Sequence, residues 1–221
     1  MNIYPKAFLF DLNGTMINDM EYHAKAWHDI LNNDLHANLT YPEVRKQMYG
    51  KNEEVLSRIF GEDHFTKQEM QEISLRKETD YQRLFRPDLK LIHGLKEFLE
   101  KADQRGISMA IASAAIPFNI DFVLDNLGIR HFFKTIVSAD DVVRSKPDPE
   151  VFTLAATNLG MEPKDCLVFE DAPTGVKAAF SAGMNVVVIT TTHIRSEFDG
   201  CANVLGFIKD YDDVLLDGLL K

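Results

Sequence analysis

Acidic residues stand directly after two short apolar runs, where a side chain can take part in chemistry. Asp11 follows the run AFLF, and Glu170 and Asp171 end the run CLVFED. Asn13 comes two positions after Asp11, at a place where a second carboxylate would make an acid–base pair. Carboxylate oxygens are preferred ligands of Mg²⁺, and a carboxylate can also act as a nucleophile. These residue types therefore indicate a metal-assisted reaction on a phosphate.

A hydroxyl group and a lysine complete the set of candidate groups. Ser113 ends the run SMAIAS, and Lys146 precedes the Pro-Asp-Pro that starts a helical pattern. A hydroxyl and an ammonium group suit phosphoryl oxygens, which need hydrogen-bond donors and positive charge. Backbone N–H groups at the helix starts near residues 114–117 and 172–173 would add further donors.

Five short apolar runs rich in β-branched residues are expected to form buried parallel strands. The runs cover residues 7–12, 108–114, 135–139, 166–171 and 185–191. Helical patterns that Pro opens and Gly closes lie between the later runs. This alternation predicts an α/β fold with a doubly wound parallel sheet. In such a sheet, ligands bind beyond the carboxyl ends of the strands, where the candidate residues stand.

A helical stretch interrupts the alternation after the first strand. It contains amphipathic patterns at 21–33 and 67–85, with no strand pattern between them. We therefore expect an α/β core formed by residues 1–18 and 88–221, and an inserted all-helical cap formed by residues 19–87.

The bulk composition excludes several classes of partner. The chain has 221 residues, 45% of them hydrophobic, and a formal net charge of -10. This charge argues against nucleic acid and against an anionic membrane surface. The sequence shows neither a transmembrane run nor a signal-peptide layout, and Cys166 and Cys201 fit no metal-ligand spacing. A reducing cytoplasm is therefore the expected location.

Four motifs, taken together, closely resemble those of the haloacid dehalogenase superfamily, in its branch of helical-cap phosphatases and β-phosphoglucomutase-like enzymes. They are DLNGT (11–15), Ser113 at the end of AIAS, Lys146 in SKPDPEVF, and EDAPTGVKAAFSAGM (170–184). They occur in the family's order, and the resemblance covers nearly the whole chain. It implies a Rossmann-like core with a helical cap, phosphoryl transfer that depends on Mg²⁺, and a monomer that acts on a small phosphorylated metabolite.

The resemblance also implies which residues hold the metal. Asp11 would be both a Mg²⁺ ligand and the nucleophile that forms an aspartyl phosphate. Asp171 would be the second carboxylate on the metal, and Glu170 would bind it directly or through water. Asn13 would contribute its main-chain carbonyl, which the side-chain type does not change.

A second group of residues would contact the phosphate. The resemblance assigns the transferred phosphoryl group to Thr15 and Ser113, with Ala114 beside them in the loop after the second strand. Lys146 would balance the charge of this group and of Asp11.

Asn13 departs from the family, which normally has Asp here as general acid and base. An amide cannot carry a proton in either step, and the loss of one such group costs about 10² to 10⁴ in rate. Three explanations stay open: a slow or specialised enzyme, proton transfer by Glu21 or His23, or an introduced substitution that traps the phosphoenzyme. Branches that cleave carbon–halogen or carbon–phosphorus bonds also lack this Asp, and they are a further alternative.

The helical stretch offers substrate candidates with less specific signals: Glu21, His23, Trp27, Lys51 and Lys77. His23 and Trp27 lie four positions apart and face one way, although a Trp in a helix more often packs in a core. Lys77 matches a substrate-facing lysine of the mutase branch, with a solvated helix face as the alternative.

Two departures weaken a sugar-bisphosphate site. The stretch YGKNEEV has Glu53 where mutases have an arginine, with only Lys51 nearby, and the loop after Ser113 is AAIPF instead of a polar run. We therefore expect a Mg²⁺-dependent phosphatase. A β-phosphoglucomutase-like phosphomutase and a catalytically degenerate regulator that binds a phosphometabolite are the alternatives.

Overall fold

The computed structural model describes residues 5–220 and divides into two compact units. One unit contains the chain up to Asn18 and again from Lys90 onward, and the other is formed by Asp19–Leu89. We call them the α/β unit and the helical unit.

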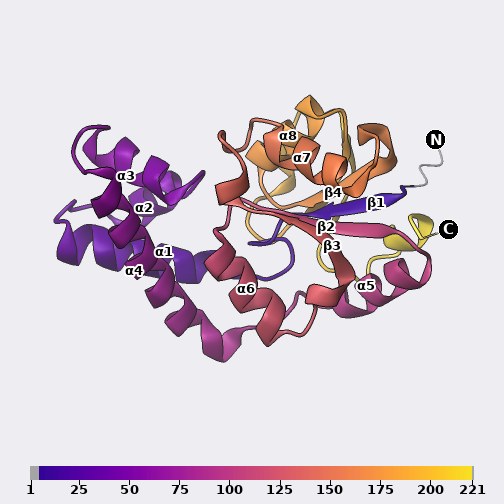
Figure 1. Ribbon diagram of the computed structural model, residues 1–221, viewed down its shortest axis with the longest axis horizontal. Coiled ribbons are helices and arrows are strands. Elements are labelled where there is room, and N and C mark those ends of the chain that lie inside the picture. The colour runs from indigo at the N-terminus through magenta and orange to yellow at the C-terminus, as the bar shows by residue number, and fades with distance from the viewer. Residues whose placement is uncertain (1–4, 221) are drawn as a thin grey trace. The chain divides into compact units, whose positions relative to one another are not determined.

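Within the described residues, six parallel strands form the sheet of the α/β unit, in the order β3-β2-β1-β4-β5-β6. Figure 1 labels the first four of this order. The strands are β1 Ala7–Phe10, β2 Ser108–Ala112, β3 Phe133–Val137, β4 Cys166–Glu170, β5 Asn185–Ile189 and β6 Val204–Ile208. The first five correspond to the five predicted runs. Strand β6 was not predicted from the sequence, because this edge strand is only partly buried and Gly206 interrupts its apolar pattern.

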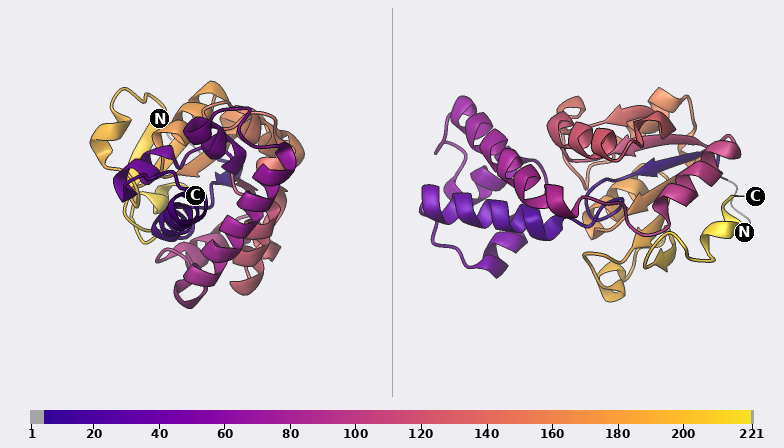
Figure 2. Two further views of the ribbon diagram at one scale, coloured as in Figure 1. Left: turned by 90° about the vertical axis from the view of Figure 1, so that its left-hand side faces the viewer. Right: turned by 90° about the horizontal axis from the view of Figure 1, so that it is seen from below.

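Helices cover both faces of this sheet, as Figure 2 shows. They are α5 Leu95–Gln104, α6 Pro117–Asn126, α7 Glu150–Leu159 and α8 Pro173–Ser181. Side chains alternate along a strand, so Ala7 and Leu9 pack with buried residues of α7 and α8. On the opposite face, Phe8 stacks on Phe98 of α5, with ring centroids 5.4 Å apart. The prediction of a doubly wound α/β core with an inserted helical segment is confirmed.

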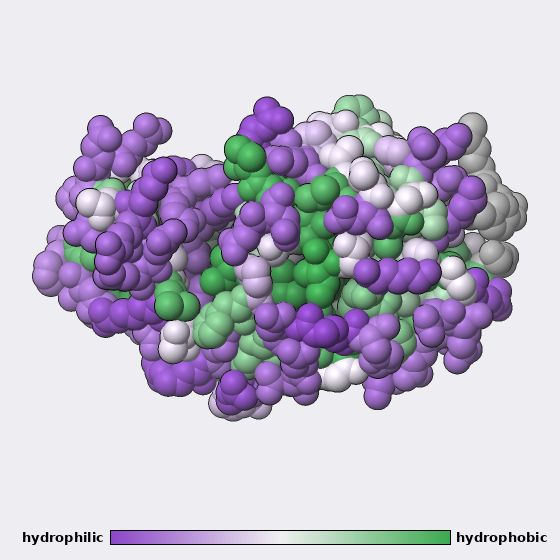
Figure 3. Space-filling model, viewed as in Figure 1, coloured by the Kyte–Doolittle hydropathy of each residue, from purple (hydrophilic) through white to green (hydrophobic). Residues whose placement is uncertain are grey.

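The helical unit contains α1 Met20–Asp29, α2 Tyr41–Gln47, α3 Asn52–Phe60 and α4 Lys67–Phe85, with a π-helical turn at Ile30–Asp34 after α1. Its small core contains Trp27 with Leu31, Val44, Val55 and Leu56. The interpretation of Trp27 as a packing residue is therefore confirmed. On the face shown in Figure 3, hydrophilic side chains cover most of this unit.

Short 3₁₀ turns connect several elements. They are Arg86–Asp88, Arg130–Phe132, Ala139–Asp141, Pro163–Asp165, Arg195–Phe198 and Leu216–Gly218. Across residues 5–220, no helix combines the length and the apolar character that crossing a membrane requires.

Candidate active site

The strand order reverses between β1 and β4, and an open parallel sheet binds ligands at such a point. The two strands are in register, with Phe10 opposite Phe169, and the Asp11 N–H donates to the Phe169 carbonyl at 3.0 Å. Asp11 therefore leaves β1 beside Glu170 and Asp171 at the end of β4. Each of the three carboxylates offers an oxygen, and these oxygens lie within 4.8 Å of one another.

Two glycines allow the carboxylates to lie this close to the backbone. A Cβ at Gly14 would lie 2.1 Å from Asp171 Oδ2, and Gly14 also has a positive φ of 74°. A Cβ at Gly175, near the start of α8, would lie 1.8 Å from Glu170 Oε1. Atoms do not approach to these distances, so any other residue at either position would displace a carboxylate.

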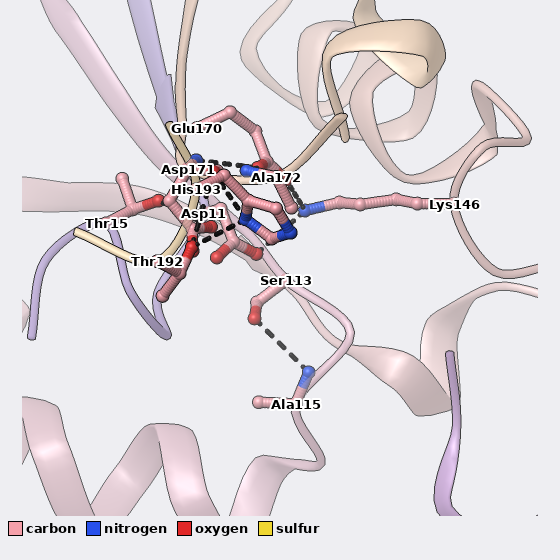
Figure 4. Close-up of polar contacts among 10 residues, drawn as sticks. All are labelled: Asp11, Thr15, Ser113, Ala115, Lys146, Glu170, Asp171, Ala172, Thr192 and His193. Atoms are coloured by element: carbon pink, nitrogen blue, oxygen red, sulfur yellow. Dashed lines mark hydrogen bonds and ion pairs between the residues drawn. The ribbon is translucent and has the colours of Figure 1, made fainter. Parts of the chain in front are cut away.

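Lys146 joins two of the three acids. Its ammonium nitrogen lies 2.7 Å from Asp11 Oδ1 and 2.8 Å from Glu170 Oε1, and its side chain is 9% exposed (Figure 4). The second oxygen of Glu170 accepts the backbone N–H groups of Asp171 and Ala172, each at 2.8 Å. Both carboxylate oxygens of Glu170 therefore have hydrogen-bond partners, which fix its orientation.

The charges of this cluster shift the pKa of its members. Burial raises the pKa of Asp11 to about 7; Lys146 acts against this shift, and Glu170 adds to it. The pKa of Asp171 is also raised, by burial first and then by the charges of Glu170 and Asp11. Burial alone would lower the pKa of Lys146, but the two carboxylates that it contacts raise it instead.

This donor set fits a divalent cation. Three buried carboxylates face a single ammonium group, so negative charge is in excess when all of them are ionised. Hard oxygen donors at this spacing are what Mg²⁺ takes in proteins. The carboxylate oxygens, and the space that Gly14 and Gly175 leave for them, therefore agree with a metal site.

The predicted phosphate-binding residues lie beside the acids. Ser113 follows β2, and its hydroxyl accepts the Ala115 N–H at 3.2 Å (Figure 4). A hydrogen bond from Ser113 also lowers the pKa of Asp11. Thr15 is buried and its hydroxyl donates to Asp171 Oδ1 at 3.5 Å. Ala114 lies in the bend directly after Ser113.

Asn13 lies between the nucleophile candidate Asp11 and Gly14. Its backbone forms a bridge with Ile17, and its side chain is partly exposed. The position therefore belongs to the loop that carries Asp11.

Three residues at this edge were missed by the sequence analysis. Thr191, Thr192 and His193 follow β5, the neighbour of β4, and contact Gly14 and Asp171. Their position at the end of the run NVVVITT, like that of Asp11 at the end of AFLF, is the sequence signal that marks them.

His23 and Lys77 meet inside the helical unit. Lys77 Nζ lies 2.7 Å from His23 Nδ1 and 2.9 Å from Glu78 Oε1, and Lys77 is 2% exposed. The alternative of a solvated Lys77 is wrong, because α1 packs along this face of α4. Burial lowers the pKa of Lys77, although Glu78 and Asp19 oppose this shift.

The other two candidates of the helical unit lie in different surroundings. Glu21 is half-exposed and accepts the Tyr41 hydroxyl at 2.7 Å, with Arg45 at 3.4 Å. Lys51 precedes α3, and its backbone N–H donates to Glu54 at 3.0 Å.

Comparison with known proteins identifies relatives over most of the chain. Residues 8–189 match the family described as haloacid dehalogenase-like hydrolase. The β-phosphoglucomutase of Bacillus subtilis is 34% identical over 188 residues, which are 82% of each chain. The fructose-1-phosphate phosphatase YqaB of Escherichia coli is 29% identical over 81% of this chain and 93% of its own.

A solved structure shows the same fold. CbbY from Rhodobacter sphaeroides, in complex with xylulose-(1,5)bisphosphate, superimposes with a TM-score of 0.84 at 24% identity. The match covers 97% of this chain and 99% of that one. The likeness therefore extends over both the α/β unit and the helical unit.

Proposed function

The chain belongs to the haloacid dehalogenase-like hydrolases, and from this premise we propose that it is a Mg²⁺-dependent phosphatase of a small phosphorylated metabolite. The buried cluster of Asp11, Glu170, Asp171 and Lys146 carries the proposal. A phosphomutase and a sugar-phosphate phosphatase among the relatives support phosphoryl transfer on this class of substrate.

Four positions would hold the metal. Asp11 and Asp171 would bind through carboxylate oxygens, Glu170 directly or through water, and Asn13 through its main-chain carbonyl. The bound ion would supply positive charge that polarises the phosphoryl oxygens.

The chain's own side chains would carry the bond changes. A carboxylate oxygen of Asp11 attacks phosphorus while the bond from phosphorus to the leaving oxygen breaks, which gives an aspartyl phosphate. Water then attacks this phosphorus, releases phosphate and restores Asp11. The ammonium group of Lys146 lowers the pKa of Asp11 against the effect of burial and so favours the ionised form that attacks. The hydroxyls of Thr15 and Ser113 would hold the phosphoryl oxygens.

Asn13 restricts the substrates that react quickly. Its amide orients a water molecule or a leaving oxygen but transfers no proton. Acyl phosphates and aryl phosphates leave as stable anions and need little protonation, so their first step is affected least. Hydrolysis of the aspartyl phosphate is then the slow step.

The contacts of the helical unit favour a phosphatase over a phosphomutase. A mutase must bind a second phosphate, for which arginine is the usual partner. Arg58 instead donates to the carbonyls of Gln47 and Tyr49, each at 2.5 Å, and stacks on the Tyr49 ring. Arg45 pairs with Glu21 of the same unit.

An activity assay of the wild type and Asn13→Asp tests this proposal. Both proteins would be given Mg²⁺ and a panel of sugar phosphates, aryl phosphates and acetyl phosphate. We expect wild-type turnover mainly of acetyl and aryl phosphates, and a rise of about 10² or more in kcat for sugar phosphates in the variant. If neither protein turns over any compound, the phosphatase is contradicted and a binding-only regulator is favoured.

A further inference from the structure

Three consecutive threonines follow β5, and their hydroxyl groups have different targets. Thr190 Oγ1 donates to the carbonyl of Ile208 at the end of β6, at 3.2 Å. Thr191 Oγ1 donates to the carbonyl of Gly14, in the loop that carries Asp11. Thr192 Oγ1 donates to Asp171 Oδ2. Two of the three hydroxyls are therefore directed at the candidate active site.

The contact between Thr192 and Asp171 is tightly enclosed. Asp171 is 5% exposed, and its Oδ2 occupies the space that a Cβ at Gly14 would need. The methyl group of Thr192 also borders this space, 3.1 Å from the same Cβ position. Rotation of the Asp171 carboxylate is thus limited by the backbone of Gly14 on one side and by the Thr192 hydroxyl on the other.

His193 orients the Thr192 hydroxyl. Its Nδ1 lies 2.8 Å from Thr192 Oγ1 and 3.1 Å from the Asp171 carbonyl, as Figure 4 shows. A hydroxyl has one hydrogen, and Thr192 donates it to Asp171 Oδ2. Nδ1 then donates to Thr192 Oγ1, a tautomer that we assign from this pattern. The result is a chain of donors that ends on a carboxylate of the acidic cluster.

We propose that Thr192 is a positioning residue that sets the affinity of the site for Mg²⁺ by fixing the orientation of Asp171. Thr191 supports it by holding the Gly14 carbonyl to the same segment. This inference rests on the proposed function, because it takes Asp171 as a metal ligand. Residues that hydrogen-bond to a metal ligand typically change metal affinity by about 10 to 100-fold when they are removed.

Titration calorimetry with MgCl₂ on the full-length protein, without substrate, tests the inference. Thr192→Val removes the hydroxyl and keeps the branched shape, and Thr192→Ser keeps the hydroxyl. We expect Thr192→Val to weaken Mg²⁺ binding by about 10-fold and Thr192→Ser to bind within about twofold of the wild type. Thr190→Val is the matched control, because it loses the same group from the same segment outside the site, and its Kd should equal that of the wild type.

The outcomes separate this inference from the proposed function. Wild-type binding of Mg²⁺ with an unchanged Kd in Thr192→Val would overturn the role of Thr192 and leave the phosphatase standing. A wild type that binds no Mg²⁺ would overturn both. If Thr192→Val lacks a cooperative melting transition, Thr192→Ala is compared with Thr192→Ser instead. A weaker Kd for Mg²⁺ in Thr192→Ala supports the role of Thr192, and an equal Kd overturns it.

Discussion

Each unit of the molecule buries a lysine among acidic side chains, but the two clusters are balanced differently. In the α/β unit, Lys146 contacts Asp11 and Glu170, with the third carboxylate of Asp171 close by. In the helical unit, Lys77 lies between His23 and Glu78, and it is within 6 Å of the ring centroids of Trp27 and Tyr81, at 5.3 and 5.8 Å.

The pKa shifts of the two lysines have opposite signs. The excess of carboxylates raises the pKa of Lys146, whereas burial is the larger effect on Lys77 and lowers its pKa. Buried charges are tolerated when they are paired and hydrogen-bonded. In the helical unit, Asn52 donates to Glu78 at 2.7 Å and the Tyr81 hydroxyl donates to Asp19 at 2.5 Å. The lysine of the helical cluster is thus paired within its own unit, whereas the acidic cluster keeps an excess of carboxylates, which suits the proposed cation.

Matched carboxylate-to-amide substitutions give the largest expected difference between the clusters. Asp171→Asn removes a negative charge from the acidic cluster, where carboxylates are in excess. It should weaken Mg²⁺ binding by more than about 100-fold, because the hard cation loses an anionic ligand. Glu78→Gln makes the same change in the Lys77 cluster of the helical unit and should leave the Kd for Mg²⁺ unchanged. Calorimetric titration measures both, and equal losses in the two variants would contradict the distinction.

The acidic cluster should also make the metal-free protein sensitive to pH. The pKa of Asp11 is raised from 3.8 to about 7, so folding favours its protonated form. The stabilisation that this gives is full below about pH 4 and is lost as the pH rises through about 7. Between pH 5 and 8, the free energy of unfolding of the wild type should therefore fall, relative to Asp11→Asn, by up to about 3 kcal/mol.

Urea unfolding in the presence of a chelator measures this difference at each pH. Saturating Mg²⁺ should reduce the fall in the free energy of unfolding between pH 5 and 8, because the cation replaces the proton at the carboxylates. A difference between wild type and Asp11→Asn that does not vary with pH would show that Asp11 is not perturbed by its neighbours.

A small effect is expected at the surface of the helical unit. Glu21 is half-exposed and paired with Tyr41 and Arg45, and exposed pairs contribute about 0 to 1 kcal/mol. Glu21→Gln should therefore change the melting temperature little and lower kcat by less than about twofold. A loss of 100-fold in kcat, at unchanged stability, would instead make Glu21 the proton carrier that Asn13 cannot be.

The sequence allowed most of the acidic cluster to be predicted, because strand ends are visible as the ends of apolar runs. Asp11, Ser113, Glu170 and Asp171 all follow such runs, and the parallel sheet brings them to one edge. Thr192 also follows such a run, but only the structure shows that its hydroxyl contacts Asp171 in the loop after β4.

The burial of Lys77 could not be read from the sequence for a different reason. Helix α4 is rich in charged residues on every face, so its composition does not show which face packs on α1. Only the packing of the helices places Lys77 and Glu78 inside and leaves Arg76 and Arg83 exposed.

The most direct test of the central claim is to trap a phosphoryl group on Asp11. The protein would be mixed with Mg²⁺ and acetyl phosphate, quenched in acid, digested and examined by mass spectrometry. Because the proposed mechanism makes the second step slow at Asn13, we expect the peptide that contains Asp11 to carry one phosphoryl group. We expect no such label in Asp11→Ala. Turnover of acetyl phosphate with an unlabelled Asp11, or with the label on another residue, would contradict the account.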